Sequence, residues 1–592
     1  AWTLGVPGFS FQTIHGGGFS GYVTGDTYVE TDCQLFCENI YGAGLGAVPF
    51  GEYSTGEGYD FGTVGGNSKI FIKAGFVGQN VYGGGAGVES VKNKDGQYFD
   101  FPDMANVQKT EVHVYGRKLK LKDTKTRNIE IDRTLIIGSV YGGGDVANVG
   151  NKNNQNYDAN NKDDASHRTT LVNIRGAGIY SQVFAGGKGR LATQCGNVTK
   201  LGAIYGNTSL LIDRPIITYP YRTETGGYED PSSTENMAHP AADINTTMLP
   251  LLMEKIYGGC QNGTVYGNTF VTLYDGRIGH GIYGGGLGSC DSIIVNGQDS
   301  LAITSADVTG NTNVYIKGGQ AMLTSYWQAD TRSWEPASII EGITYSPQYN
   351  HQALKFKINH NIYAGGNIAC VVGKDAHLTM EKGLLHDNTQ VVYGVNVKFF
   401  ETMAWKEIYN KVGSPHFCVF GGGYGEHTII KGDTHVNIAM TGRGSKIDPS
   451  IDLKKGEEYK HFWSGYSVMD FVGGGYSGKV EGETYVTGDG GAFCRRLFGG
   501  GFYNSVKATH VDIHAMDCRD IFGGGMMGDV EKSTTVNIGT QNPSATSSEN
   551  TFSNKDIFIH GNVYGGNDVS GYVNVVQKNG NFTDNEGTGT HI

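Results

Sequence analysis

Long apolar runs and dense basic clusters are both absent from this chain. No stretch of 18 or more consecutive apolar residues occurs in its 592 residues, whereas a helix that spans a bilayer needs about 20. The formal net charge is −12, with acidic and basic residues interspersed, so a partner with a phosphate backbone is not expected. We therefore predict no direct membrane span and no nucleic-acid partner.

The signatures of common catalytic and cofactor sites are absent as well. The sequence has no G-x-S-x-G elbow, no H-E-x-x-H pair and no Walker lysine, and its aspartates do not follow the spacing of a calcium loop. Glycine-rich segments at 16–21, 473–478 and 523–528 match G-x-G-x-x-G, but no strand-helix-strand pattern follows them, so we interpret them as corners of a repeat. We predict no cofactor, no metal and no assignable catalytic residue.

Glycine, by contrast, is abundant, with 93 residues, roughly twice ordinary usage. It occurs in a phrase in which an aromatic or β-branched residue precedes a run of glycines. Copies lie 26 residues apart at His15 and Tyr41, at Tyr257 and Tyr283, and at Val472 and Phe498. A fixed period of this length indicates a repeat architecture. We expect the glycines at corners, where a positive φ and the absence of a Cβ allow a tight turn.

A second phrase, T-x-V-x-I, returns between the glycine runs. Its alternation of residue types is typical of a half-buried strand, and only 13 prolines interrupt strand pairing. Stacked coils would place equivalent residues about 4.8 Å apart and bury a continuous apolar column. The predicted fold class is therefore all-β, a single parallel β-helix or β-solenoid over residues 1–592 with coils of about 24–26 residues.

Long loop insertions interrupt the repeat where the distance between glycine runs exceeds one coil. We place them at approximately 92–130, 151–166, 213–256, 319–360 and 440–466. In repeat proteins such insertions lie on the surface and often carry recognition. The aromatic residues of one insertion are ligand-binding candidates: Tyr326, Trp327, Trp334, Tyr345 and Tyr349.

Polar residues occupy equivalent positions in the later T-x-V-x-I phrases. His435, Tyr485, His510 and Thr535 form one predicted column, Asn437, Thr487, Asp512 and Asn537 form a second, and His514 lies one step further on. These side chains could hydrogen-bond sugar hydroxyls or bind a metal. The alternative, which we favour, is that they are solvated and stabilise the sheet face by cross-strand contacts. His377 and His427 are expected to be isolated surface residues.

The 9 cysteines are odd in number and sparse for a disulfide framework. Cys494 and Cys518 each precede an aromatic residue by four positions, one repeat apart. Stacking of coils would bring their Cα atoms to about 4.8 Å, which a disulfide accepts. They form either a disulfide or a ladder of buried thiols.

The segment Phe471–Val486, with its V-G-G-G-Y-S-G and T-Y-V phrases, resembles the glycine-rich β-solenoid surface proteins of bacteria, of the Bacteroidetes type and similar in build to autotransporter and adhesin stalks. The resemblance implies an extracellular or bacterial cell-surface location, with anchoring by a segment outside this chain. Repeat copies lie close to both ends, at His15 and Tyr564, so we also expect a processed chain or a piece of a longer one. The long aromatic insertions depart from a regular stalk.

The function predicted from these features is adhesion, or recognition of a glycan or of a host or bacterial surface protein, through the aromatic insertion loops. The first alternative is a carbohydrate-active β-helix enzyme, a polysaccharide lyase or glycoside hydrolase, using Asp512 with His510 and His514, or acids such as Asp470 and Glu481. The second is a scaffold subunit of a surface assembly or filament. We consider an enzyme less favoured than a binding protein.

Overall fold

A computed structural model describes most of the chain. The residues that it does not describe are 1–8, 49–57, 89, 97, 116–118, 123–127, 132–133, 153–160, 192–200, 214–249, 275–276, 296, 318–319, 322–324, 329–332, 337–360, 382–390, 393–394, 397–417, 440–466, 540–556, 560, 579–580, 585–589 and 592. All elements of the described residues are strands, and none of these residues forms a helix long and apolar enough to cross a membrane.

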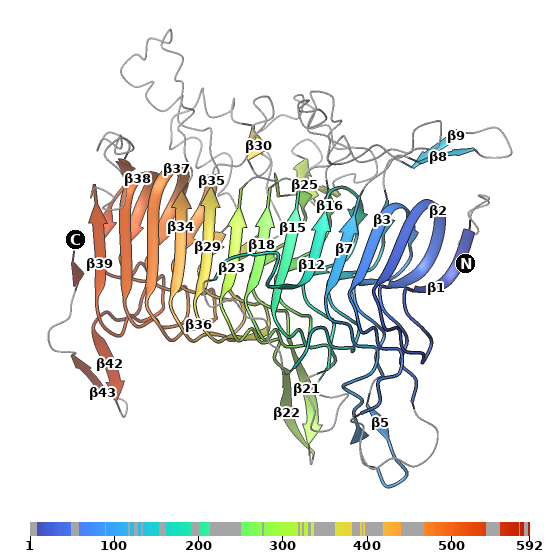
Figure 1. Ribbon diagram of the computed structural model, residues 1–592. Coiled ribbons are helices and arrows are strands. Elements are labelled where there is room, and N and C mark those ends of the chain that lie inside the picture. Colours follow the sequence, from blue (N-terminus) through green and yellow to red (C-terminus); the bar gives the residue numbers. More distant parts are fainter. Residues whose placement is uncertain are drawn as a thin grey trace.

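The chain winds into a parallel β-solenoid, with the N-terminal and C-terminal coils at opposite ends of one column (Figure 1). One row of strands, here called the valine sheet, carries the T-x-V-x-I phrases. It consists of β2 (Thr27–Tyr41), β3 (Ser68–Val77), β7 (Thr110–Val114), β12 (Arg168–Ile174), β15 (Asn207–Ile212), β18 (Thr269–Leu273), β23 (Thr312–Ile316), β29 (Ala376–Glu381), β34 (Thr434–Ala439), β37 (Thr484–Phe498), β38 (Thr509–Phe522) and β39 (Thr534–Ile538). Its strands pair in parallel and stay in register over the T-x-V-x-I segments, as the repeat predicts, although the pairs β2–β3, β12–β15 and β37–β38 shift register outside them.

A second row, here called the aromatic sheet, leads into the glycine runs. It consists of β1 (Phe9–His15), β4 (Val81–Tyr82), β11 (Val140–Tyr141), β14 (Val183–Phe184), β17 (Ile256–Tyr257), β20 (Ile282–Tyr283), β27 (Ile362–Tyr363), β32 (Cys418–Phe420), β35 (Ser467–Val472), β41 (Val563–Tyr564) and the last residues of β2, β37 and β38. Its rings stack coil upon coil, with centroids 4.9 Å apart between Tyr82 and Tyr141 and 5.0 Å apart between Phe498 and Phe522.

Shorter parallel strands complete the coils, and antiparallel hairpins project from them. The short strands are β10 (Leu135–Ile136), β13 (Gly178–Ile179), β16 (Leu251–Leu252), β19 (Arg277–Ile278), β24 (Gln320–Ala321), β28 (Ala369–Val372), β33 (His427–Ile430), β36 (Lys479–Val480), β40 (Ile557–Ile559) and β44 (Thr590–His591). The hairpins are β5 (Val91–Lys92) with β6 (Tyr98–Phe99), β8 (Leu119–Lys122) with β9 (Asn128–Ile131), β21 (Ser289–Val295) with β22 (Gln298–Thr304), β25 (Ser325–Gln328) with β26 (Ser333–Pro336), β30 (Val391–Val392) with β31 (Val395–Asn396), and β42 (Val575–Lys578) with β43 (Asn581–Asp584).

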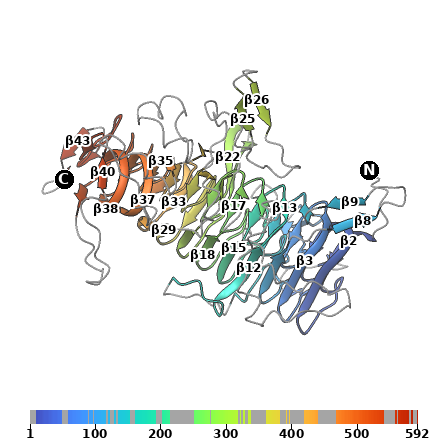
Figure 2. The same ribbon diagram turned by 90° about the horizontal axis from the view of Figure 1, so that it is seen from above.

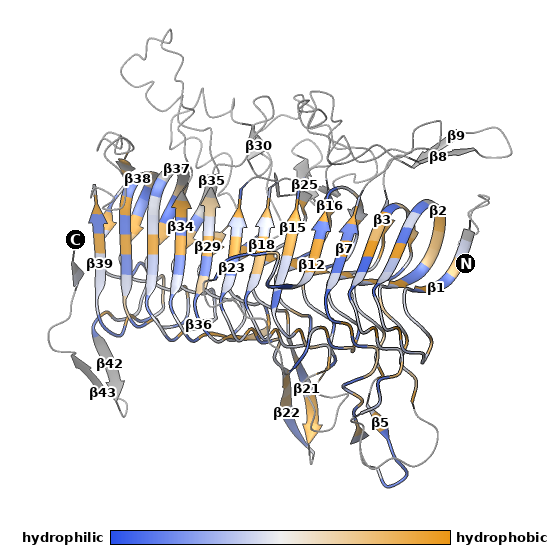
Figure 3. Cartoon of the chain, viewed as in Figure 1, coloured by the Kyte–Doolittle hydropathy of each residue, from blue (hydrophilic) through white to orange (hydrophobic). Residues whose placement is uncertain are grey.

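The core is a column of Val, Ile and Leu that runs the length of the solenoid. Val112, Val172, Leu210, Val271 and Val314 stack in successive coils and are fully buried. Hydrophobic and hydrophilic bands alternate along the strands of the valine sheet (Figure 3). The alternation that predicted half-buried strands is therefore confirmed.

The threonine that opens most of the T-x-V-x-I phrases ties the two sheets together, with Thr312 as an exception. Thr269 Oγ1 donates to the carbonyl oxygen of Gly284 at 2.6 Å, and both groups are buried. The equivalent bond recurs at Thr27, Thr110, Thr170, Thr208, Thr434, Thr484, Thr509 and Thr534. The hydroxyl satisfies a carbonyl that the glycine corner would otherwise leave buried without a partner.

The glycine runs are required by close approach between coils, not by unusual backbone angles. A Cβ on Gly421 would lie 2.2 Å from the carbonyl oxygen of Gly473, and a Cβ on Gly422 would lie 2.7 Å from the nitrogen of Gly475. Neither glycine has a positive φ. The expectation of positive φ at these corners is therefore wrong, whereas the expected need for a missing Cβ is confirmed.

The predicted insertions are only partly described. Within 92–130, Thr110–Val114 forms β7 of the valine sheet, so a solenoid strand interrupts that range. Residues 251–252 and 256 likewise belong to coil strands inside the range 213–256, whose residues 214–249 lie outside the described chain. Hairpin β25–β26 lies in the range 319–360 and projects from the solenoid (Figure 2). The range 440–466 lies outside the described residues.

Candidate ligand-binding face

The outer face of the valine sheet carries a continuous column of four polar rings, here called the ring column. Its members, in coil order, are His377 of β29, His435 of β34, Tyr485 of β37 and His510 of β38. Their rings stack with centroids 4.7, 5.0 and 4.6 Å apart, and each side chain is half-buried. The predicted register of His435, Tyr485, His510 and Thr535 is confirmed.

His377 was expected to be an isolated surface residue, and this expectation is wrong. It lies opposite His435, and the two imidazoles are parallel to within 8°. The strand β29 reads A-H-L-T-M, so Ala, Leu and Met stand where Thr, Val and Ile mark the phrase elsewhere. One signal could have identified His377. It follows Asp375 by two residues, just as His435 follows Asp433 in the next coil.

The ring column begins where a covering segment ends. In the three preceding coils the same position holds Ser209, Phe270 and Asn313, which are fully buried. Residues of the predicted insertion 151–166 lie over them: Asn161 exchanges hydrogen bonds of 3.0 and 2.8 Å with Asn313, and Asp163 accepts one of 2.7 Å from Ser209. The outer face is thus partly exposed from β29 onward.

A row of carboxylates accompanies the ring column, two residues before His377, His435 and Tyr485, whereas Ala508 holds this position before His510. Asp375 accepts a hydrogen bond from the backbone N–H of Asp433 at 3.0 Å, and Asp433 accepts one from Glu483 at 2.8 Å. Asparagines make the same bond in earlier coils, where Asn268 accepts one from the N–H of Asn311 at 2.8 Å. Acids therefore hold this position in the coils of His377, His435 and Tyr485, as Asp26 does in the first coil.

Hydrogen bonds within this face shift the protonation of its groups. Burial favours the protonated form of Glu483, but hydrogen bonds from His510 at 3.0 Å and Tyr485 at 3.1 Å outweigh it and lower the pKa of this carboxyl. Burial and the bond to Glu483 raise the pKa of Tyr485 to about 12. Burial and the neighbouring His435 lower the pKa of His377, with Asp375 opposing them.

The second predicted column lies beside the ring column and is also in register. Asn437, Thr487, Asp512 and Asn537 face one another across successive strands. Asn537 Nδ2 donates to Asp512 Oδ1 at 2.7 Å. Amide, hydroxyl and carboxylate groups thus supply both donors and acceptors along the outer face.

The residues considered for catalysis have separate partners. His510 contacts Glu483, Asp512 contacts Asn537, and His514 hydrogen-bonds Asp489 where β37 and β38 bend. Asp470 is fully buried and forms ion pairs with Arg496 at 2.7 Å and Arg495 at 3.3 Å. Glu481 lies 3.5 Å from the Nζ of Lys479.

The aromatic candidates of the insertion 319–360 are described only in part. Tyr326 and Trp327 belong to β25 and Trp334 to β26, and the backbones of Trp327 and Trp334 lie opposite each other. The positions of these three side chains are outside the description. Tyr345 and Tyr349 lie outside the described residues altogether.

Cys494 and Cys518 are paired in register, as their spacing predicts. Both side chains are buried, and the Cys494 thiol donates to the Cys518 sulfur at 3.1 Å. A disulfide would need about 2.05 Å, so the structure holds the pair as adjacent thiols. Oxidation to a disulfide stays a prediction.

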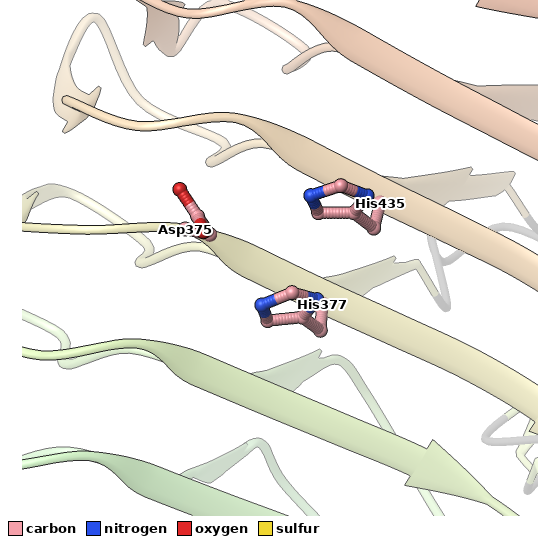
Figure 4. A group of neighbouring side chains, drawn as sticks. All are labelled: Asp375, His377 and His435. Atoms are coloured by element: carbon pink, nitrogen blue, oxygen red, sulfur yellow. The ribbon is translucent and has the colours of Figure 1, made fainter. Parts of the chain in front are cut away.

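Three members of the outer face could share a metal ion. One ligand atom from each of Asp375, His377 and His435 lies within 4.8 Å of the others. The two imidazoles come from neighbouring strands, and Asp375 lies directly before β29, two residues ahead of His377 (Figure 4).

Comparisons with protein-family models, with curated proteins and with solved structures found no match for this chain.

Proposed function

We propose that this protein is an extracellular, surface-attached β-solenoid of the glycine-rich bacterial surface type, which recognises a glycan or a surface protein of a host or another bacterium. The observation that supports the proposal best is the ring column with its parallel rows of acids and amides. Along this face the polar rings repeat once per coil, and the polar side chains beside them do the same. Such a row suits an extended ligand whose own polar groups repeat.

The geometry of the ring column defines how a ligand would be contacted. Stacked rings cover one another's faces, so the exposed parts are ring edges, which carry the imidazole nitrogens and the Tyr485 hydroxyl. These edges donate and accept hydrogen bonds. Flat aromatic faces for stacking on sugar rings would come instead from the 319–360 insertion, with Trp327 and Trp334 on its hairpin.

Recognition accounts for the described acids better than catalysis does. Asp512, Glu483 and Asp489 each hydrogen-bond a neighbouring side chain, and Asp470 is neutralised by two arginines. Glycoside hydrolases instead use two carboxyl groups that flank the scissile bond. The acids named above are each engaged with another side chain and do not form such a pair. An enzyme remains the alternative proposal, and release of reducing sugars or unsaturated products that Asp512→Asn abolishes would establish it in place of recognition.

A glycan array followed by affinity measurement on the best ligand tests the proposal. The double variant Tyr485→Phe with Asp512→Asn removes one hydroxyl and one charge while keeping ring stacking and side-chain size. We expect at least about a tenfold loss of affinity, since two hydrogen bonds contribute about 1 kcal/mol each. Deletion of the hairpin at 325–336, which leaves the coil strand β24 in place, should weaken binding further.

The matched control is Tyr28→Phe, which changes the equivalent position of the first coil, far from the ring column. It should bind as the unmodified chain does. If the double variant and the deletion both bind normally, the ligand site lies elsewhere and the proposal fails. If the protein binds no glycan on the array, recognition of a surface protein becomes the form of the proposal to test. The same variants would then be compared in binding to whole cells.

A further inference from the structure

We propose that Asp375, His377 and His435 bind a divalent first-row transition-metal ion, for which zinc is the simplest probe. The sequence predicted no metal, because His377 was not recognised as part of the ring column. The donor set is two imidazoles and one carboxylate, the set found where zinc keeps an open position for water or a further ligand. Hard ions such as calcium prefer oxygen ligands alone.

The geometry is close to what such an ion needs. The three ligand atoms lie within 4.8 Å of one another. Tetrahedral zinc, with bonds of 2.0–2.2 Å, holds its donor atoms about 3.3 Å apart. Binding therefore draws the donors together by roughly 1.5 Å at most, which rotation of half-buried side chains supplies without moving the paired strands.

The backbone around the three residues is fixed. β29 and β34 pair in register over six residues, Ala376 to Glu381 with Thr434 to Ala439. The Asp375 carboxylate is oriented by the backbone N–H of Asp433 at 3.0 Å. Outer hydrogen bonds of this kind hold a ligating carboxylate in position.

The two imidazoles differ from other polar rings on the same sheet. His510 and Tyr485 both hydrogen-bond Glu483, and His113 hydrogen-bonds Glu111 at 3.1 Å. Within the described part of the chain, His377 and His435 have no hydrogen-bond partner for their ring nitrogens. Half-buried imidazoles that face each other without partners retain their nitrogens for another ligand.

The repeat also shows where the site was introduced. Moving along the valine sheet, the accepting residue changes from Asn311 to Asp375 in the coil where the ring position changes from Asn313 to His377. Asparagine already satisfies the backbone N–H in earlier coils, so hydrogen bonding does not require the acid. A negatively charged carboxylate beside two histidines is instead what binding of a cation requires.

Zinc titration of the full chain after chelator treatment, followed by calorimetry, tests the proposal. We expect one zinc per chain, with the affinity reduced at least about tenfold in His377→Ala and in His435→Ala. Loss of a residue that only hydrogen-bonds a metal ligand already reduces affinity by that factor. The sharpest variant is Asp375→Asn. It restores the residue used in earlier coils and keeps the backbone bond, so it should fold normally and still weaken zinc binding.

His113→Ala provides the control, because this histidine lies on the outer face of the same sheet but outside the group. It should leave zinc binding unchanged. Cobalt(II) provides a second readout, since visible ligand-field bands should appear with the unmodified chain and be lost in His435→Ala. Zinc binding that is unchanged in both histidine variants, or absent from the unmodified chain, would overturn the proposal whether or not glycans bind.

Discussion

At the scale of single residues, the polar side chains of the outer face interact with one another both along a strand and between neighbouring strands. Glu111 lies 3.1 Å from the Nζ of Lys69 in the neighbouring coil and 3.1 Å from Nε2 of His113 on its own strand. The hydrogen bond from His113, with a further contribution from Lys69, outweighs burial and lowers the pKa of Glu111 from 4.5 to about 2. The folded chain therefore favours the ionised carboxylate.

This shift predicts a pH dependence of stability. Because the folded-state pKa of Glu111 is below its unfolded value, the carboxylate stabilises the fold above pH 4.5, and this stabilisation is lost as pH falls toward about 2. The side chain is 36% exposed, so we expect less than about 1 kcal/mol. Denaturant unfolding should show Glu111→Gln less stable at about pH 6 and equal to the unmodified chain near pH 2. An equal deficit at both pH values would contradict the assignment.

At the scale of the strand and its corner, spacing between coils decides which residue is allowed. The second glycine of the corner phrase is Gly422 in one coil and Gly566 in the last described corner. A Cβ on Gly422 would meet Gly475 backbone atoms at 2.7 and 2.8 Å, whereas a Cβ on Gly566 meets nothing within 4 Å. The same phrase therefore carries different constraints at different positions along the column.

The two glycines form a matched pair for substitution. Gly422→Ala should destabilise the protein by about 1–3 kcal/mol or more, because the backbone of the next coil must shift. Gly566→Ala should be neutral or slightly stabilising, since alanine restricts the unfolded chain. Chemical denaturation of both variants measures the difference. Equal destabilisation would mean that the corner is constrained by its backbone conformation and not by contact with the next coil.

The elements also show what the sequence could predict of this molecule. Strand type, coil length and the register of His435, Tyr485 and His510 were readable because each coil repeats the same alternation. His377 was missed because its strand substitutes Ala, Leu and Met at the inward positions. Such residues pack in the core equally well, but they do not match the T-x-V-x-I phrase from which the register was predicted.

Contacts between distant segments set a different limit. Asn161 and Asn313 are 152 residues apart in sequence, and their contact decides where the outer face becomes accessible. Nothing in a local pattern encodes that pairing. For the same reason the range 92–130 was assigned to one insertion, although β7 lies within it in register with β3 and β12.

At the scale of the whole molecule, each coil contacts only the coils beside it, so stability is approximately one-dimensional. The strand β12 pairs with β7 and β15, and Val172 at its centre is fully buried in the core column. The ring column lies several coils away toward the C-terminus (Figure 1). Damage at Val172 should therefore stay local.

Val172→Asp tests this property of the solenoid. Burying an unpaired carboxylate costs several kcal/mol, so the amides of β7, β12 and β15 should lose protection in hydrogen-exchange mass spectrometry, whereas those of β37 and β38 should keep it. Val569→Asp is the control, because this valine is 64% exposed, so the same substitution buries no charge and should leave exchange unchanged. Loss of protection over the whole chain in Val172→Asp would instead show that the coils unfold as one cooperative unit, and a ligand bound at the ring column would then stabilise every coil.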